Sequence, residues 1–576
     1  MSVVPHKPAP EQSGLPGFTL PLDYLPKEKP LPLCPHALQF TSTSLKVHRE
    51  ILMMRVMNAI TDKPEWNQKV FNEEITVKWR DEIFSSGEDI SPAMMDYIVK
   101  ELQWKANLLK SDGFITVFDI GVVKSDTAIP EELRKALVDE VALLENIPDD
   151  QKDYHPRTDK KVLDLVHPSL FPLVYGRSRI LRDKSIGLED CLGTTGQGEV
   201  IGVPEDAGGL YSHKFQWLPC DVELSSTEAE PECRITSYIN NLHPGRHLTL
   251  YKVIEKVIAR AIPLWNRTLT GEIYKSHRIE YFYVDLNHLE PEPVQGPDET
   301  DRAHWHRWMK WKSTGTIKQP EPREFTEYKS DNPMDIQKLF GDTGLQVIVK
   351  LANIELSPEK PEYKGGSWHI EGQLNERICA TAIYYYDSEN ITESNLAFRQ
   401  RADEEDIEDI SYPQGEHEFL QEIYGFGSNI DGYSANAQMT QDLGGVVCRQ
   451  GRLLTFPNVV QHCVTPFSLA DRSKPGHRKI LALFLVDPHL RIISTANIPP
   501  QQEDWGREKY NLAQNVLSEK LPAELRNMVC DEGVLQQLMS MDEAKELRLE
   551  LMKERSAKSL EQNEIFEKGD FNLCEH

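Results

Sequence analysis

The chain has 576 residues, of which 39% are hydrophobic and 27% charged, so it has enough apolar material for a folded core. Acidic residues outnumber basic ones by 91 to 64, which gives a formal charge of −27. This balance argues against nucleic acid and against an anionic membrane surface as partners, because both are bound through clustered basic residues.

Neither a membrane span nor a secretory signal is visible in the sequence. No apolar run reaches the roughly 20 residues that a spanning helix needs, and the start, MSVVPHKPAPEQSG, lacks an apolar segment. The nine cysteines are scattered and contain no CxxC pair, which argues against a disulfide framework and a zinc ribbon. We therefore expect an intracellular protein, cytoplasmic or nuclear.

In chain order, residues 1–40 predict an extended Pro-rich arm, with nine prolines before residue 37. Residues 41–339 predict a mainly helical region, with helices that begin at Ser91-Pro92 and Pro130 and a third near 250–261. The segment 278–286 (RIEYFYVDL) predicts a strand, and a long polar insertion follows it.

Residues 340–500 are rich in short runs of Val, Ile and aromatic residues bounded by Gly, Pro, Asp and Asn. The predicted strands are 345–356, 378–386, 445–449, 453–456 and 479–486. Residues 501–576 turn helical again, and a long helix is expected at about 533–562. The predicted fold class is therefore α+β: a double-stranded β-helix (a jelly roll of the cupin kind) with helical flanking regions.

The predicted core contains a constellation that suits a metal ion. His369 and Glu371 are two residues apart, so on a strand they point the same way, and His462 follows a later strand and a Pro turn. Two histidines and one carboxylate are the facial triad of non-haem iron(II) oxygenases, which leaves three positions for a chelating 2-oxo acid and dioxygen. Arg478, at the entry of another strand, suits the far carboxylate of that acid because its planar fork binds bidentately.

His369-x-Glu371, His462 and the Gly-x-Arg-x-x-Leu strand of Arg478 together resemble the Fe(II)- and 2-oxoglutarate-dependent oxygenases, over about residues 340–490. The wider chain, from about 45 to 510, resembles a fungal family of proteins of unknown function, through segments at 162–180, 215–224, 238–244 and 451–462. The first resemblance implies Fe(II) and 2-oxoglutarate as cofactors and the hydroxylation or oxidation of a substrate, either a small molecule or a protein side chain.

The chain departs from the oxygenase pattern at two points. Glu371 stands where Asp is usual, and Arg478 lies 16 residues after His462, where the usual gap is nearer ten. Arg472 has the usual spacing, but it lies in a Pro- and Ser-rich loop, so we prefer Arg478. Two other functions therefore stay open: a degenerate barrel that binds or scaffolds other molecules, and a cupin-like metal enzyme without 2-oxoglutarate.

Four further residues are weaker candidates for this site. Tyr384 and Tyr386 share a strand face and are predicted to line a cofactor pocket, although ordinary core packing is an equal interpretation. Trp368 and Asn375 frame the metal motif and are predicted to lie behind the ligands. A competing motif, His304-x-His306, lacks a third ligand nearby, so its aromatic neighbours are expected to pack the insertion instead.

Overall fold

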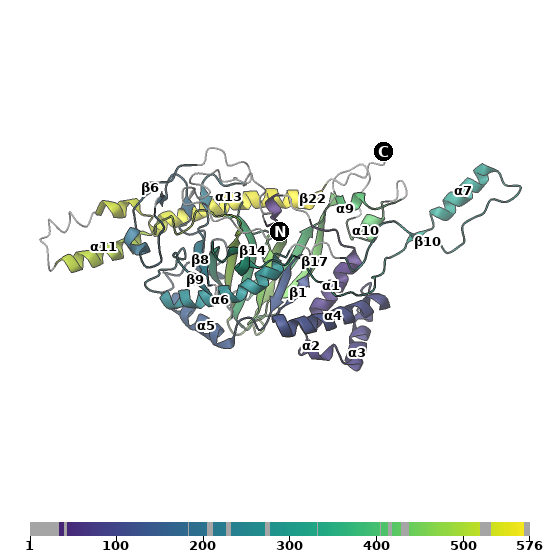
Figure 1. Ribbon diagram of the computed structural model, residues 1–576, viewed down its shortest axis with the longest axis horizontal. Coiled ribbons are helices and arrows are strands. Elements are labelled where there is room, and N and C mark those ends of the chain that lie inside the picture. The colour runs from purple at the N-terminus through teal and green to yellow at the C-terminus, as the bar shows by residue number, and fades with distance from the viewer. Residues whose placement is uncertain are drawn as a thin grey trace.

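In the residues that it describes, the computed structural model contains twelve α-helices and a set of antiparallel sheets (Figure 1). It describes residues 34–39, 43–182, 184–203, 211–225, 232–270, 277–330, 332–403, 405–412, 417–427, 437–518 and 532–569. Most of the Pro-rich arm predicted for residues 1–40 lies outside these ranges. The helices are α1 (His48–Thr61), α2 (Trp66–Lys69), α3 (Glu73–Phe84), α4 (Pro92–Asp112), α5 (Glu131–Glu145), α6 (Leu248–Thr268), α7 (Asp301–Lys312), α8 (Ile336–Phe340), α9 (Glu405–Glu408), α10 (Phe419–Glu422), α11 (Glu503–Ser518) and α13 (Met541–Glu567).

A nine-stranded antiparallel sheet forms the centre of the molecule, in the order β1-β2-β18-β14-β21-β12-β8-β9, with β3 also paired to β12. Its strands are β1 (Ile115–Phe118), β2 (Val122–Ser125), β3 (Val162–Val166), β8 (Cys220–Leu224), β9 (Cys233–Ile235), β12 (Leu345–Leu356), β14 (Ile378–Glu389), β18 (Leu453–Pro457) and β21 (Gly476–Val486). Four of the five strands predicted within 340–500 lie in this sheet, and the fifth, predicted at 445–449, overlaps a strand of the smaller sheet, Thr440–Val447.

A smaller sheet contains β17 (Thr440–Val447), β15 (Asn395–Arg401) and β19 (Gln461–Val464), in that order. One buried cluster joins the two sheets, with Ile348, Ile383 and Phe484 from the large sheet and Leu396, Phe398 and Val446 from the small one. The sheets thus pack face to face, and the ladders found among the described strands do not close them into a barrel. The structure is mixed α+β with antiparallel sheets.

Short two-stranded pairs complete the strand inventory. They are β4 (Leu173–Val174) with β7 (Phe215–Gln216), β5 (Arg179–Ile180) with β6 (Glu199–Val200), β10 (Leu286–Asn287) with β11 (Thr316–Ile317), β13 (Glu362–Tyr363) with β20 (Phe467–Ser468), and β16 (Ala437–Gln438) with β22 (Lys568–Gly569). The strand β13 ends six residues before His369, so the β13–β20 pair precedes the loop that carries this residue.

Helices cover the outer face of the large sheet. Leu481, Leu483 and Leu485 alternate along β21 and share a buried cluster with α6 residues such as Ile254 and Val257. The odd-numbered residues of β21 therefore face these helices, and the even-numbered ones face the small sheet. Figure 1 shows α5 and α6 near each other at the lower left of the body.

The region 41–339 supplies strands as well as helices. Its strands β1 and β2 extend the large sheet beyond β18, while β3, β8 and β9 extend it beyond β12. Without them, β12 and β18 would present unpaired N–H and C=O groups along the edges of the sheet. The sheet therefore continues across the predicted boundary at residue 340.

The predicted helices of this region are present. Helix α4 begins where Ser91 Oγ accepts the Met94 N–H at 3.1 Å, and it ends at Gly113, whose φ of 76° is a left-handed conformation suited to glycine. The strand predicted for 278–286 is absent: this segment shows only a single bridge, from Tyr283 to Ser411, before β10. Its exposed aromatic side chains, Phe282 and Tyr283, have no sheet to pack on.

The C-terminal helix α13 crosses the molecule and, in Figure 1, lies along one side of both sheets. Ala544, Leu551 and Phe566 are buried along it, so the long helix predicted near 533–562 is present and packs its apolar stripe on the body. In contrast, α7 projects away from the body and buries no residue. Among the described helices, none is both long and apolar enough to cross a membrane.

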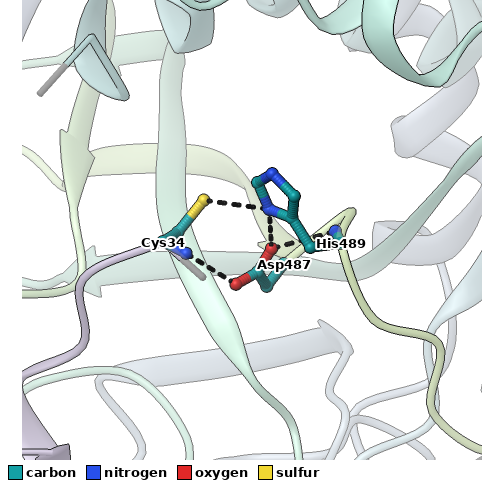
Figure 2. Close-up of side chains that lie close together, drawn as sticks. All are labelled: Cys34, Asp487 and His489. Carbon is teal, nitrogen blue, oxygen red and sulfur yellow. Dashed lines mark hydrogen bonds and ion pairs between the residues drawn. The ribbon is translucent and has the colours of Figure 1, made fainter. Parts of the chain in front are cut away.

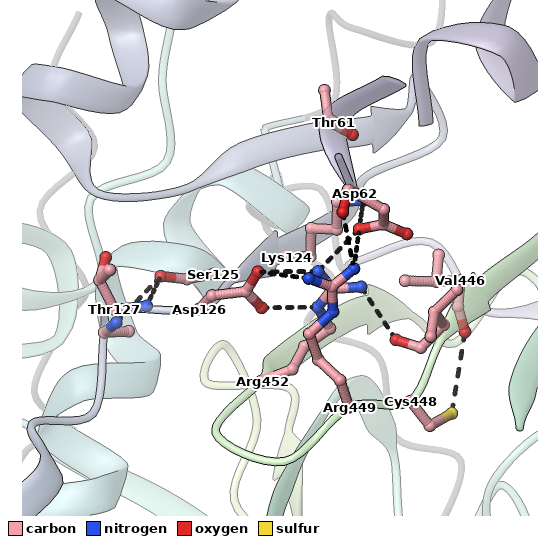
Figure 3. A network of polar contacts seen from close by, with 12 residues as sticks. Thr61, Asp62, Lys124, Ser125, Asp126, Thr127, Val446, Cys448, Arg449 and Arg452 are labelled. Atoms are coloured by element: carbon pink, nitrogen blue, oxygen red, sulfur yellow. Dashed lines mark hydrogen bonds and ion pairs between the residues drawn. The ribbon is translucent and has the colours of Figure 1, made fainter. Parts of the chain in front are cut away.

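A buried ionic network ties α1 to the sheet (Figure 3). Arg452, which is fully buried, donates from Nε and Nη2 to Asp126 at 2.7 and 2.8 Å and from Nη2 to Asp62 at 2.8 Å. Lys124 in β2 donates to the same Asp62 oxygen at 2.7 Å. Burial lowers the pKa of Lys124 to about 8. The network therefore joins the end of α1, the end of β2 and the start of β18.

Candidate metal centre

The structure brings His369, Glu371 and His462 together. His462 lies in β19, and His369 forms an antiparallel bridge with it, with N–H···O distances of 3.2 and 3.0 Å in the two directions. Glu371 Oε1 lies 3.4 Å from His462 Nε2 and 3.8 Å from His369 Nε2. Their nitrogen and oxygen atoms that could ligate a metal all lie within 4.8 Å of one another, so the three side chains converge on one point.

A glycine pair allows the His369 loop to approach β19. Gly365 has φ of 88°, and a Cβ there would lie 2.7 Å from the backbone oxygen of Val464, closer than atoms can approach. The next residue, Gly366, donates its N–H to the same oxygen at 2.9 Å. The Gly-Gly-Ser-Trp-His sequence therefore seats His369 beside His462.

Hydrogen bonds fix the tautomer of His369 and the backbone of Glu371. His369 Nδ1 lies 2.8 Å from the Ser367 carbonyl oxygen, so this nitrogen carries the proton and the Nε2 lone pair faces Glu371. Asn458 holds the backbone of Glu371 from both sides: its Oδ1 accepts the Glu371 N–H at 2.9 Å, and its Nδ2 donates to the Glu371 carbonyl at 2.9 Å. Asn458 was not predicted, although it lies within the Pro turn that precedes His462.

Electrostatics leave these groups in the forms that bind cations. Burial would raise the pKa of Glu371, but the hydrogen bond to His462 and the charges of both histidines lower it to about 2. Burial, followed by the charge of His462, lowers the pKa of His369 to about 4. Near neutral pH the carboxylate is therefore ionised and the His369 imidazole neutral.

Arg478 lies on the inner face of the large sheet and is 2% exposed. Its Nη1 donates to Ser394 Oγ at 2.7 Å, and its guanidinium lies 5.0 Å from the Phe467 ring and 5.6 Å from the Tyr385 ring. Nε has no partner, and no carboxylate among the described residues pairs with this cation. Arg472 differs, because it is exposed and pairs with Glu362 at 2.9 Å.

Tyr384 and Tyr386 lie on the opposite face of β14. Both belong to the buried cluster beneath α6, whereas Tyr385 belongs to the cluster between the sheets. Tyr386 Oη donates to Asn353 Oδ1 at 3.3 Å. The alternation along β14 thus directs Tyr385 toward the side of Arg478 and turns Tyr384 and Tyr386 toward α6.

The two residues predicted to lie behind the ligands have different roles. Trp368 lies beneath the Arg399 guanidinium at 4.8 Å, and its carbonyl accepts from Asn563 of α13 at 3.1 Å. The Asn375 side chain instead binds the backbone of Ser212: its Oδ1 accepts the Ser212 N–H at 2.6 Å, and its Nδ2 donates to the Ser212 carbonyl oxygen at 3.0 Å. His304 and His306 lie on α7, which projects from the body.

Lys350 is a further inner-face cation that the sequence did not reveal. It pairs in register with Ala482 of β21, so its side chain shares a face with Arg478, and its charge lowers the pKa of both Glu371 and His369. Neither a hydrogen bond nor an ion pair holds its ammonium within the described ranges. Its position in the middle of the apolar run LQVIVKLANIEL gave no signal of function.

A second cluster, His155, Asp164 and His167, also has metal-ligand composition. However, the Ser169 N–H donates to His167 Nδ1 at 3.1 Å, so a neutral His167 carries its proton on Nε2 and neither nitrogen offers a free lone pair. His155 Nδ1 is already bound to Asp164 at 2.8 Å. The hydrogen bonds therefore distinguish this cluster from the one at His369.

Figure 2 shows a third cluster, in which Cys34 and His489 meet Asp487. His489 Nδ1 lies 3.9 Å from Cys34 Sγ and 2.7 Å from Asp487 Oδ1, so both contacts use the same nitrogen. A nucleophilic triad needs the carboxylate on one nitrogen and the nucleophile on the other. The contacts of this cluster therefore hold Cys34 next to the end of β21, and they do not activate the Cys34 thiol as a nucleophile.

This third cluster predicts a pH dependence of stability. Burial would lower the pKa of His489, but its hydrogen bonds with Asp487 and Cys34 raise it from 6.5 to about 10. A raised pKa contributes stability below pH 6.5 that is lost as the pH rises toward 10, at up to about 1.4 kcal/mol per pH unit. We expect the free energy of unfolding to fall from pH 6.5 to 8.5, measured by urea denaturation, and to fall less in His489→Gln. As a control, His306→Gln on the projecting helix should show the same dependence of the free energy of unfolding on pH as the wild type. If His489→Gln also showed the wild-type dependence, this explanation would be wrong.

The fold and the cluster together define an α+β protein with a two-histidine, one-carboxylate constellation beside the inner face of its large sheet. The chain belongs to a family described as "Protein of unknown function (DUF4246)", whose model matches residues 92–509. Residues 15–82 match the N-terminal domain of unknown function of the same family.

Other comparisons add little. No curated protein matches the chain. A solved structure, a bsmA homolog from Methylobium petroleophilum PM1, is 9% identical, with 66% of this chain and 91% of that chain covered and a TM-score of 0.20. A similarity this low supports no statement about the fold or the function.

Proposed function

We propose that His369, Glu371 and His462 bind Fe(II) and that the protein is a 2-oxoglutarate-dependent oxygenase. The observation that carries this proposal is the meeting of the three side chains, with the His369 lone pair and the Glu371 carboxylate directed at one point. The donor set fits iron, because two imidazoles and one carboxylate hold it on one side and leave positions for other ligands. Bound there, Fe(II) with a chelating 2-oxo acid would supply the oxidant for a substrate C–H bond.

The strand order supports the same proposal. The sequence β12-β21-β14-β18 in one sheet and β17-β15-β19 in the other, with His369 bridged to β19, suits a double-stranded β-helix. In that arrangement the metal ligands lie on the small sheet and in the loop beside it. The inner face of the large sheet would then provide the cosubstrate pocket.

The chain's own residues would bind the 2-oxo acid through its distal carboxylate. Arg478 is the preferred partner, because it is buried beside aromatic rings without a carboxylate of its own among the described residues. Its two parallel N–H groups suit a carboxylate. Lys350 on the same face is the competing cation.

Metal binding can be tested directly. We expect His369→Ala to weaken Mn(II) binding, used as an oxygen-stable substitute for Fe(II), by more than about 100-fold, since even outer-shell partners of metal ligands contribute 10–100-fold. Isothermal titration calorimetry measures this. His304→Ala is the matched control and should bind as the parent does, and equal binding by both variants would refute the assigned ligands.

Thermal shift separates the remaining functions. Stabilisation by Mn(II) that increases with N-oxalylglycine, a stable analogue of 2-oxoglutarate, supports the oxygenase. Stabilisation by metal alone supports a cupin-like metal enzyme without 2-oxoglutarate. A protein that responds to neither would favour a scaffolding role for the two sheets.

A further inference from the structure

A cavity with about 90 Å³ of space lies apart from the metal cluster. Helix α4, strand β1, the end of α6 and the segment 323–328 enclose it. Its lining combines four cations with aromatic rings, and the residues are Tyr97, Glu101, Trp104, Lys105, Thr116, Asp119, Arg267, Arg278, Arg323, Phe325, Thr326, Glu327 and Tyr328.

Most charges in this cavity neutralise one another. Arg278 is buried and binds Glu101 at 2.6 and 2.7 Å and Asp119 at 2.5 and 3.0 Å. Lys105 Nζ lies 2.9 Å from Glu101, and Arg323 lies 3.1 Å from Glu280, outside the cavity. The cations Arg278, Lys105 and Arg323 are therefore each paired with a carboxylate of the protein.

Two charged groups of the lining have no ion pair among the described residues, the exposed carboxylate of Glu327 and the guanidinium of Arg267. Arg267 stands in the last turn of α6, and its Nε donates to Thr116 Oγ1 at 2.9 Å. Its two terminal nitrogens have no acceptor and no ion-pair partner in the described part of the chain. The side chain of Arg267 is half-buried: burial lowers its pKa, and the charges of Tyr328, Asp112 and Asp119 offset this only in part.

Part of the cavity lining is aromatic. The Phe325 ring lies 5.4 Å from the Tyr97 ring, edge to face, and 6.1 Å from the Trp104 ring. Ring edges and faces at these spacings suit another aromatic ring. A planar apolar ligand with one negative end would therefore suit both these rings and Arg267.

We propose that this cavity is a binding site for a small aromatic carboxylate. The carboxylate binds the terminal nitrogens of Arg267, which forms two parallel charge-assisted hydrogen bonds. The ring packs among Tyr97, Trp104 and Phe325. The site takes no residue from the metal cluster, so it stands independently of the proposed oxygenase activity.

Benzoate is the probe that tests this site, with benzamide as its uncharged analogue and acetate as the anion without a ring. We expect calorimetry to show benzoate binding at least tenfold more tightly than either. Arg267→Gln should lose at least tenfold in benzoate affinity, and Arg267→Lys should lose less. Phe325→Leu should also weaken benzoate and leave acetate unchanged, which keeps the test valid if an Arg267 variant misfolds.

Two controls locate the binding. Arg302→Gln removes an exposed cation of α7 and should bind benzoate as the parent does. His369→Ala should also keep full affinity. Absence of benzoate binding, equal binding of acetate, unchanged affinity in both Arg267→Gln and Phe325→Leu, or loss in His369→Ala would each overturn the proposal.

Discussion

Replacing Arg478 by alanine is expected to weaken 2-oxoglutarate binding by two orders of magnitude or more. Breaking a buried charge pair by removing one partner costs about 3–5 kcal/mol, and about 1.4 kcal/mol corresponds to a factor of ten in affinity. The metal affinity should stay nearly unchanged, because Arg478 binds Ser394 and is not among the ligands. Calorimetric titration of 2-oxoglutarate into the Mn(II)-loaded protein measures both quantities.

Two further variants show which cation binds the distal carboxylate of 2-oxoglutarate. Arg472→Ala removes an exposed guanidinium that already pairs with Glu362, so 2-oxoglutarate binding should remain as in the parent. Lys350→Ala removes the other inner-face cation. If Lys350→Ala lowers the affinity for 2-oxoglutarate and Arg478→Ala does not, the distal carboxylate of the 2-oxo acid binds nearer the middle of β12. The assignment to Arg478 is then wrong. If the parent protein binds no 2-oxo acid, the cosubstrate itself is wrong.

Replacing Arg452 by methionine is expected to lower the free energy of unfolding by about 3–5 kcal/mol. The variant would leave Asp126 without its main partner and Asp62 with fewer partners at the junction of α1, β2 and β18 (Figure 3). The neighbouring Arg449 offers a matched control, since it also binds Asp62, at 3.0 Å, but its side chain is 39% exposed.

Arg449→Met should therefore cost no more than about 1 kcal/mol, the upper range for exposed ion pairs. Urea denaturation of the two variants beside the parent measures the difference. Equal stability of both variants would mean that the buried network adds nothing beyond a surface pair.

The sequence predicted that His369, Glu371 and His462 lie together, because the signal for their proximity is local. His369 and Glu371 are two residues apart, and His462 follows a Pro turn, so spacing alone suggested a common point. The face of the large sheet on which each residue lies was harder to predict. Alternation along β14 indicates that Tyr384 and Tyr386 share a face, but it does not indicate whether that face is turned toward the small sheet or toward the helices. That choice depends on α6, which is more than 100 residues away in the sequence and covers the outer face.

The failures elsewhere have similar long-range causes. Lys350 looks like an interruption of an apolar run until the register with β21 places it opposite Ala482. Segment 278–286 has strand composition, yet Arg278 is held by Glu101 and Asp119 rather than by a neighbouring strand. No local pattern marks Asn458, because its role depends on two hydrogen bonds to the backbone of Glu371, which is 87 residues away in the sequence.

The place of β21 in the large sheet has a consequence for biosynthesis. This strand lies between β12 and β14, but it is the last of the nine to be translated. Until residue 486 leaves the ribosome, the strand that pairs with both β12 and β14 is missing. The edges of these two apolar strands that face β21 therefore remain unpaired. Pairing across such separations is slow and exposes strands that aggregate. We therefore expect chains shortened before β21 to be captured by chaperones or lost to inclusion bodies, whereas chains that end after it can close the sheet.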